Sequence, residues 1–294
     1  MKSKINYSYF KVVIVGLLLL CVSLFVSCSK NDEKEMTDTK TYKKVETSNV
    51  VEEKEPLIVV MELAYPPFET KDVNGNPSGI SVDFAKAFGE SLGREVKIVN
   101  TAWEGLIPSL QTGKADMIIS SMTITEARGE VVDFSLPYAN SLLGILVNKD
   151  SKIEKAEDLN SKGMKIAVKA GSTGFIYAKA NMTNAQIITL ADESACVTEV
   201  SQGKADAFFY DQLTIYRNWQ KHIDTTRAIF VPFQDTEKWG VAVKKGNEEL
   251  LNQINDFIPE FTKNGGFDEL SEKYLKEEKK AFEELGFKWF FDLT

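Results

Sequence analysis

Three hydroxyl residues and an arginine follow a short apolar run in the first half of the chain. Residues 117–119 are typical of a buried strand; Ser120, Ser121 and Thr123 come after it, and Arg128 follows. In an open parallel α/β sheet, ligands bind at the carboxyl ends of the strands. An arginine can donate two parallel charge-assisted hydrogen bonds to a carboxylate, and hydroxyls add neutral donors. The stretch therefore predicts a grip for a small carboxylate; the alternative is a surface loop with an exposed arginine.

Thr125 is placed to begin the short helix that carries Arg128. We expect this helix over residues 126–131, because a threonine hydroxyl readily accepts a hydrogen bond from a backbone N–H of the first turn. The guanidinium of Arg128 then lies in the first turn, where free backbone N–H groups also attract anions.

A Gly-Lys-Ala-Asp sequence occurs twice, each time between a predicted helix and a predicted buried strand. The first copy spans residues 113–116 and the second residues 203–206. The second copy is followed by the strand at residues 207–210, which leads to Asp211 where the first leads to two serines. The shared context favours two similar α/β halves that face each other; the alternative is that a common way to enter a strand recurs by chance.

An acid opposite the arginine would complete a site for a free amino acid. An ammonium group has three donors and no acceptor, so it needs a carboxylate and further oxygen atoms, which Asp211 and Thr123 can supply. Tyr65 and Trp103 each follow a predicted strand, where aromatic faces can enclose a side chain. The alternatives are that Asp211 only caps a helix and that both aromatic residues only belong to the core.

Apolar runs and helical periodicity alternate along the chain, which is typical of an α/β fold. We expect strands at residues 57–61, 96–99, 117–119, 165–168, 186–190, 207–210, 230–233 and 240–243, with extended chain at 134–138 and 142–147. We expect helices at residues 81–91, 103–111, 126–131 and 248–261, one that ends at Ala180 and one that Asp192 caps. The aromatic cluster Trp289, Phe290 and Phe291 is expected in the core.

The first 27 residues have the composition of a secretory signal. Three lysines precede an uncharged and largely apolar run at residues 12–26, which is short for a membrane span. Residues 25–28, Phe-Val-Ser-Cys, resemble a bacterial lipobox, in which Cys28 is acylated and becomes the mature N-terminus. The alternative is an uncleaved anchor; in both cases the following domain faces outside the cytoplasm. Residues 28–56 are rich in charged residues and lack an apolar period, which predicts a disordered tether.

The mature chain is acidic and poor in cysteine. The formal net charge of −8 becomes −11 without residues 1–27, which hold three lysines and no acid. This charge argues against nucleic acid as a partner. Cys196 is the cysteine left beside Cys28, so we expect no intramolecular disulfide and a packed Cys196 on a helix. The sequence has no recognisable metal cluster or phosphate loop, and we expect no cofactor.

Several motifs occur together in a fixed order between residue 57 and about Tyr274. They are residues 65–68 (Tyr-Pro-Pro-Phe), 103–110 (Trp-Glu-Gly-Leu-Ile-Pro-Ser-Leu), 120–128, 132–138 (Val-Asp-Phe-Ser-Leu-Pro-Tyr), 171–174 (Gly-Ser-Thr-Gly) and 206–211. In this combination the sequence resembles the polar amino-acid-binding proteins of bacterial ABC importers, of the glutamine-, histidine- and arginine-binding type.

This resemblance implies a type II periplasmic binding protein, an α/β fold of two Rossmann-like lobes joined by a two-strand hinge. Lobe 1 would comprise residues 57–142 and 243–294, and lobe 2 residues 143–242. The hinge strands would lie near residues 141–146 and 238–243. We expect an extracytoplasmic monomer that lipid on Cys28 anchors to the bacterial cell membrane, or that faces the periplasm.

The resemblance also implies a role for each site residue. Arg128 would bind the α-carboxylate of an L-amino acid with help from the Ser172-Thr173 loop. Asp211, Thr123 and the backbone near Ser121 would hold the α-ammonium, and two aromatic residues would flank the side chain. The expected ligand-binding residues are Glu62, Tyr65, Trp103, Ser120, Ser121, Thr123, Arg128, Lys169, Ser172, Thr173 and Asp211.

Two positions bear on which amino acid is bound. Glu62 lies where the family usually has an aspartate that touches the ligand side chain, and Lys169 matches a lysine of glutamine-binding members. An acceptor and a donor together suit an amide, which favours glutamine; arginine, histidine and glutamate remain alternatives.

We therefore expect a non-enzymatic protein that hands a polar L-amino acid to the membrane permease of an ABC importer. The alternative is a dehydratase-like enzyme on the same fold that acts on prephenate-type acids. That chemistry needs a general acid or base near the cleft. Glu62 could act as the acid, whereas His222, the single histidine, is expected at a solvated helix end.

Overall fold

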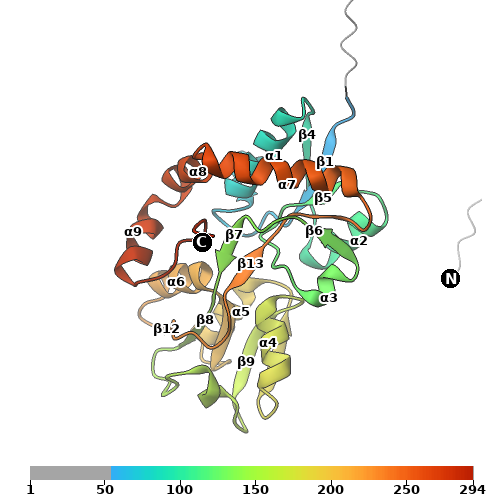
Figure 1. Cartoon of the computed structure of the whole chain (residues 1–294). Helices are drawn as coiled ribbons and strands as arrows, with labels where there is room; N and C mark the ends of the chain where they lie inside the picture. The colour runs from blue at the N-terminus through green and yellow to red at the C-terminus, as the bar shows by residue number, and fades with distance from the viewer. Residues whose placement is uncertain (1–53, 294) are drawn as a thin grey trace, which may run out of the picture. The chain divides into compact units, whose positions relative to one another are not determined.

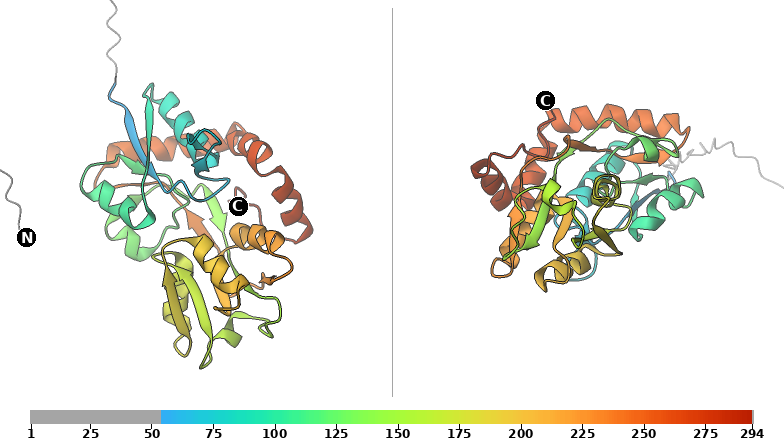
Figure 2. Two further views of the ribbon diagram at one scale, coloured as in Figure 1. Left: turned by 180° about the vertical axis from the view of Figure 1, so that it is seen from behind. Right: turned by 90° about the horizontal axis from the view of Figure 1, so that it is seen from below.

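The computed structural model describes residues 54–293, which form two five-stranded sheets with helices around each (Figures 1 and 2). We call the part built on the first sheet lobe 1 and the part built on the second sheet lobe 2. The predicted signal, its lipidation site Cys28 and the predicted tether up to residue 53 lie outside the described residues.

The sheet of lobe 1 has the order β4-β1-β5-β14-β6, in which β14 runs antiparallel to both of its neighbours. β1 pairs in parallel with β4 and β5, and four of its five residues are buried. A continuous apolar run suits a strand that is covered on both faces. The strands are β1 (Leu57–Met61), β4 (Val96–Asn100), β5 (Met117–Ile118), β6 (Val132–Phe134) and β14 (Ala242–Lys244).

The sheet of lobe 2 follows the same plan, with the order β10-β9-β11-β8-β12. β9 pairs in parallel with β10 and β11, while β8 runs antiparallel to β11 and β12. The strands are β8 (Leu143–Asn148), β9 (Lys165–Lys169), β10 (Gln186–Leu190), β11 (Ala207–Asp211) and β12 (Thr226–Ile229). The two matching sheets confirm the predicted α/β fold of two similar halves.

Helices cover both sheets. On lobe 1 they are α1 (Ile80–Ser91), the 3-10 turn η1 (Trp103–Gly105), α2 (Leu106–Gln111), α3 (Glu126–Gly129), α7 (Glu248–Lys263) and α8 (Gly266–Tyr274), and α9 (Lys276–Glu284) follows α8. On lobe 2 they are the 3-10 turn η2 (Ala156–Leu159), α4 (Thr173–Asn181), α5 (Glu193–Ser201) and α6 (Gln212–Lys221). α7 buries Leu250, Ile254 and Ile258, which recur every four residues on one helical face. Cys196 is buried on α5, as expected.

A separate pair of strands joins the lobes. β7 (Ala139–Ser141) and β13 (Glu237–Trp239) pair antiparallel in a two-stranded sheet between the two larger ones (Figure 1). The expected hinge at residues 141–146 and 238–243 was therefore placed a few residues too late in the chain, because residues 143–146 belong to β8 and residues 242–243 to β14. A second small sheet pairs β2 (Thr70–Lys71) with β3 (Pro77–Ser78).

The two Gly-Lys-Ala-Asp turns have the same geometry. Gly113 and Gly203 adopt left-handed φ angles of 71° and 68°, which a glycine tolerates without steric cost. The carboxylate of Asp116 accepts from the backbone N–H of Ile58 at 2.7 Å, and that of Asp206 accepts from Lys165 at 2.7 Å. Each turn thus ties the strand that follows it to its parallel neighbour in the sheet, β1 in lobe 1 and β9 in lobe 2.

Several predicted elements were wrong in position or type. Residues 230–233 do not form a strand; β12 ends at Ile229, because Pro232 lacks the N–H that a sheet ladder needs. Of the expected strand at residues 240–243, only residues 242 and 243 are in a strand, β14, since the chain passes from the hinge strand β13 into lobe 1 there. The extended stretch at residues 134–138 is a strand only up to Phe134, and the helix at 126–131 ends at Gly129.

Candidate functional site

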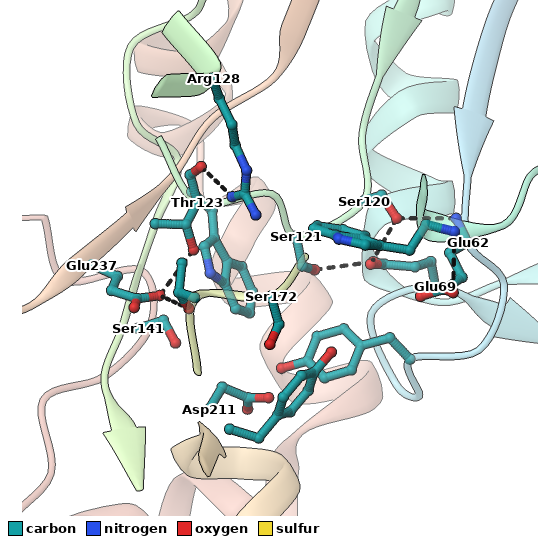
Figure 3. Close-up of a pocket in the computed structure, with 15 residues that line it drawn as sticks. Glu62, Glu69, Ser120, Ser121, Thr123, Arg128, Ser141, Ser172, Asp211 and Glu237 are labelled. Atoms are coloured by element: carbon teal, nitrogen blue, oxygen red, sulfur yellow. Dashed lines mark hydrogen bonds between the residues drawn. The ribbon is translucent and has the colours of Figure 1, made fainter. Parts of the chain in front are cut away.

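A pocket lies between the lobes and is lined by both of them (Figure 3). Its volume of about 50 Å³ holds about four water molecules. The lining residues are Glu62, Tyr65, Glu69, Trp103, Ser120, Ser121, Thr123, Arg128, Ser141, Ser172, Thr173, Tyr210, Asp211, Glu237 and Trp239. Every predicted site residue except Lys169 is among them, and Lys169 is in contact with Glu62.

Arg128 projects into the pocket from α3. Thr125 is the N-cap of this helix and accepts from the backbone N–H of Arg128, as predicted. The guanidinium donates to the carbonyls of Thr123 at 2.6 Å and Gly171 at 3.0 Å, and lies 5.3 Å from the ring centroid of Trp103. Burial lowers the pKa of Arg128 to about 10, so the side chain stays charged at neutral pH. Both of these hydrogen bonds go to neutral oxygen atoms, which leaves a buried cation able to bind an anion.

Asp211 enters the pocket from lobe 2, opposite Arg128 (Figure 3). Its Oδ1 atom caps α6 by accepting from the N–H groups of Leu213 and Thr214, each at 3.0 Å. Its Oδ2 atom is buried and accepts no hydrogen bond of ordinary geometry within residues 54–293, although the nearby Tyr65 hydroxyl acts to lower the pKa of Asp211. Asp211 is therefore a helix cap that also lines the pocket, and its role in holding an ammonium group stays a prediction.

Two further buried oxygens of the pocket share this lack of a partner within the described part of the chain. They are the hydroxyls of Tyr65 and Ser141. A buried polar group without a hydrogen bond costs about 1–3 kcal/mol. Burial also raises the pKa of Asp211, because the charged form loses its hydration. A ligand that brings several N–H donors would relieve both costs.

Glu69 holds the serines at the end of β5. Its carboxylate accepts from Ser81 at 2.6 Å, from Ser121 at 3.1 Å and from Ser120 at 3.3 Å. Ser121 adopts a left-handed φ of 47°, which is uncommon for a residue with a side chain. Burial of Glu69 raises its pKa to about 8, and the charge of Glu62 acts in the same direction. The protonated form therefore predominates at neutral pH.

Glu62 and Lys169 form an ion pair between the lobes. Glu62 also accepts from the backbone N–H of Trp103 at 3.2 Å. The ammonium of Lys169 lies 5.5 Å from the ring centroid of Trp103. The acceptor and the donor predicted to face the ligand side chain therefore face each other in this structure.

Sequence reasoning missed five lining residues, which are Glu69, Ser141, Tyr210, Glu237 and Trp239. Glu237 accepts from Thr123 of lobe 1 at 2.9 Å and from Thr173 of lobe 2 at 3.0 Å. Glu69 directly follows the Tyr-Pro-Pro-Phe motif, which was a usable signal. Glu237 had no comparable signal, because it lies in a polar stretch of ordinary surface composition.

The described part of the chain shows neither a metal site nor a membrane span. Among residues 54–293, no group of three or more His, Cys, Asp or Glu side chains is arranged to hold a metal ion. None of the helices in that range has the length and apolar character needed to cross a bilayer.

Comparison with known proteins agrees with this geometry. The chain is 34% identical over 229 residues to the L-cystine-binding protein TcyJ of Escherichia coli K12, which covers 77% of this chain and 85% of that protein. It is 33% identical over 210 residues to the ABC transporter glutamine-binding protein GlnH of Bacillus subtilis 168, with 70% and 75% covered.

A solved structure supports the same relationship. The ancestral amino acid-binding protein AncCDT-1, described as a precursor of cyclohexadienyl dehydratase, superposes with a TM-score of 0.68 at 39% identity and covers 74% of this chain and 95% of its own. Residues 57–277 match the model of the bacterial extracellular solute-binding proteins, family 3. The chain belongs to this family, the extracytoplasmic amino-acid-binding proteins of ABC importers.

Proposed function

We propose that this protein captures a polar L-amino acid, with L-glutamine favoured, and delivers it to the permease of an ABC importer. The observation that carries the proposal is the pair of opposite charges on facing lobes. Arg128 has neutral hydrogen-bond partners and Asp211 has a buried oxygen without one. A zwitterion supplies an anion for the first and a cation for the second.

In this proposal the α-carboxylate lies against Arg128 and the Ser172-Thr173 loop. Ser172 is the N-cap of α4, so free backbone N–H groups begin there. The α-ammonium donates to Asp211 Oδ2 and Thr123. Tyr65 and Trp103 lie against the ligand side chain.

The Glu62–Lys169 pair supports glutamine as the ligand. A carboxamide has both a donor and an acceptor, so it can insert between the two charges, donating to Glu62 and accepting from Lys169. A cationic side chain would satisfy Glu62 but would repel Lys169. The relative GlnH is a glutamine-binding protein.

Calorimetry on refolded, ligand-free protein tests this choice. We expect saturable heat with L-glutamine and much weaker binding of L-arginine. Lys169→Met keeps the length of the side chain but removes the donor, and should weaken L-glutamine binding by about 10-fold. Saturation with L-arginine and no heat with L-glutamine would contradict the amide assignment.

We further propose that the mature protein is a monomeric lipoprotein with Cys28 as its first residue. Lobe 1 would comprise residues 57–142 and 243–294, and lobe 2 residues 143–242. The support is the basic and apolar composition of residues 1–27, which precedes the Phe-Val-Ser-Cys sequence. Intact-mass measurement of the membrane-extracted protein tests this, since a first residue other than diacylglyceryl-Cys28 contradicts it.

An enzyme acting on prephenate-type acids is the second candidate, and one observation favours it. Glu69 lines the pocket as a buried carboxyl with a pKa of about 8, which is the kind of group that serves as a general acid. Three serine hydroxyls already donate to that carboxyl, however, and this arrangement suits a structural role better. Incubation with prephenate decides between the binding protein and the enzyme. Turnover of prephenate that is lost in Glu69→Gln would show that the protein is an enzyme.

A further inference from the structure

The chain continues beyond the part that it shares with its family. The family match ends at residue 277, whereas the described chain runs through α9 to residue 293. α9 lies beside α6 of lobe 2, although the helices that precede it belong to lobe 1 (Figure 1). We refer to residues 276–293 as the C-terminal segment.

The first half of the C-terminal segment contacts lobe 2. Glu278 on α9 forms an ion pair with Arg217 on α6, with 2.8 Å between Oε1 and Nε. The ring of Phe282, also on α9, packs against Tyr216 of α6. Phe287 packs edge-on against Phe230, with ring centroids 4.8 Å apart.

The second half returns to lobe 1 and to both hinge strands. The ring of Phe290 stacks on Trp239 of β13 with centroids 5.8 Å apart. The backbone N–H of Asn140 on β7 donates to the carbonyl of Phe290 at 2.6 Å. Phe291 stacks on Phe267 of α8 with centroids 4.5 Å apart. The segment therefore leaves lobe 1, contacts lobe 2 and ends on the hinge.

Separation of the lobes moves α6 away from lobe 1 and disturbs these contacts. Arg217 also donates directly to the carbonyl of Pro66 in lobe 1 at 2.8 Å, so the segment reinforces an existing contact between the lobes. The side chain of Glu278 is 13% exposed and that of Arg217 is 35% exposed, so the pair is only partly shielded from solvent and its own contribution is modest. Trp239, on which Phe290 stacks, lines the ligand pocket.

We propose that the C-terminal segment is a strap across the hinge that holds the ligand-free lobes near their closed arrangement. The apparent affinity of a ligand is proportional to the population of the binding-competent state, so it falls when that population falls. The strap thus strengthens ligand binding without touching the ligand. This inference does not depend on which amino acid is bound.

The test compares two double variants of the full chain. Glu278→Gln with Phe287→Ala removes two of the three contacts described between the strap and lobe 2, and leaves the contact of Phe282 with Tyr216 in place. Glu272→Gln with Leu285→Ala is the matched control, since it also removes one carboxylate and one apolar side chain. Glu272 forms an exposed ion pair with Lys276, and Leu285 is 43% exposed. Small-angle X-ray scattering of ligand-free protein gives the radius of gyration, and calorimetry with L-glutamine gives the affinity.

We expect the strap variant to have a larger ligand-free radius of gyration than the parent and the control, and about 5-fold weaker L-glutamine binding. Equal radii for all three proteins would overturn the proposal, even if the strap variant melts at a lower temperature. If the double variant does not fold, Glu278→Gln alone serves as the test, because it removes no packed ring. Its ligand-free radius of gyration should also exceed that of the parent. Absence of heat with L-glutamine in every protein would contradict the proposed ligand and leave the scattering comparison intact.

Discussion

The two Gly-Lys-Ala-Asp turns enter their sheets in the same way but lead to opposite chemistry. After the first turn, β5 ends at Ile118 and the chain continues as a loop of hydroxyl residues that reaches Arg128. After the second, β11 continues to Asp211, which starts α6 directly. A short strand therefore exposes donors on lobe 1, and a long strand places an acid on lobe 2.

The two charges differ in what surrounds them. Arg128 is stabilised by carbonyl oxygens and by the face of Trp103. Asp211 is stabilised by the N–H groups at the start of α6, on one oxygen only. Burial disfavours the charged form of both side chains, lowering the pKa of the first and raising that of the second. The charge of Glu237 on the hinge partly offsets the effect of burial on the pKa of Arg128, and under the proposed function both charges would be available to a zwitterion.

Removal of the cation on lobe 1 should have the largest effect. Arg128→Ala leaves a buried ligand carboxylate without its partner, a loss of about 3–5 kcal/mol. We expect L-glutamine binding to weaken by about 100-fold or more, as measured by calorimetry. The melting temperature without ligand should change little in comparison. An Arg128→Ala protein that binds normally would contradict the assignment of lobe 1.

Two substitutions at Asp211 should separate its two functions on lobe 2. Asp211→Asn removes the charge but retains an oxygen that can cap α6, so affinity should fall while the melting temperature holds. Asp211→Ala also removes the cap, which costs about 1 kcal/mol and about 2–4 °C in melting temperature. Equal melting temperatures for the two variants would show that the cap contributes nothing.

Glu69 should make the stability of lobe 1 depend on pH. Its pKa is about 8 in the folded chain against an ordinary value of 4.5, so the folded state binds more protons between these values. Its contribution to stability is present at low pH and is lost as the pH rises from about 4.5 to about 8. In thermal melts, the melting temperature of Glu69→Gln should decline less over this pH range than that of the parent. Glu90→Gln, exposed on α1, is the control and should follow the parent.

The smallest effects should come from the turns themselves. Asp116→Asn and Asp206→Asn each weaken one hydrogen bond to a backbone N–H, and each should cost about 1 kcal/mol of unfolding free energy. Because the two bonds are equally long, the two losses measured by denaturant titration should be similar. Ligand affinity should not change in either variant. A loss confined to one of them would show that the turns are not equivalent.

Local signals in the sequence predicted much of the fold and of the site. Thr125 caps α3 because a hydroxyl before a helix is a local preference, and the two turns follow from glycines that adopt left-handed angles. The same local logic failed at residues 230–233, where aromatic residues are typical of a strand. Phe230 instead packs on Phe287, and Phe233 on Tyr177, around a proline that cannot pair in a sheet.

Contacts between distant segments could not be predicted from the sequence. Glu237 becomes part of the site because the hinge brings β13 between Thr123 and Thr173. The pairing of Glu62 with Lys169 depends on how far the lobes are closed, and no local pattern encodes that separation. The aromatic residues 289–291 were predicted to be buried, and they are, but their position against the hinge was not foreseen.

A thermal-shift panel of the twenty L-amino acids tests the central claim most directly, because it requires only that an α-amino acid binds the folded protein. A ligand at 100 times its dissociation constant stabilises by about 2.7 kcal/mol, so we predict a clear rise in melting temperature, largest with L-glutamine. Analogues of glutamine that lack the α-carboxylate or the α-ammonium should not raise the melting temperature. A panel in which none of the twenty amino acids raises the melting temperature would contradict the account.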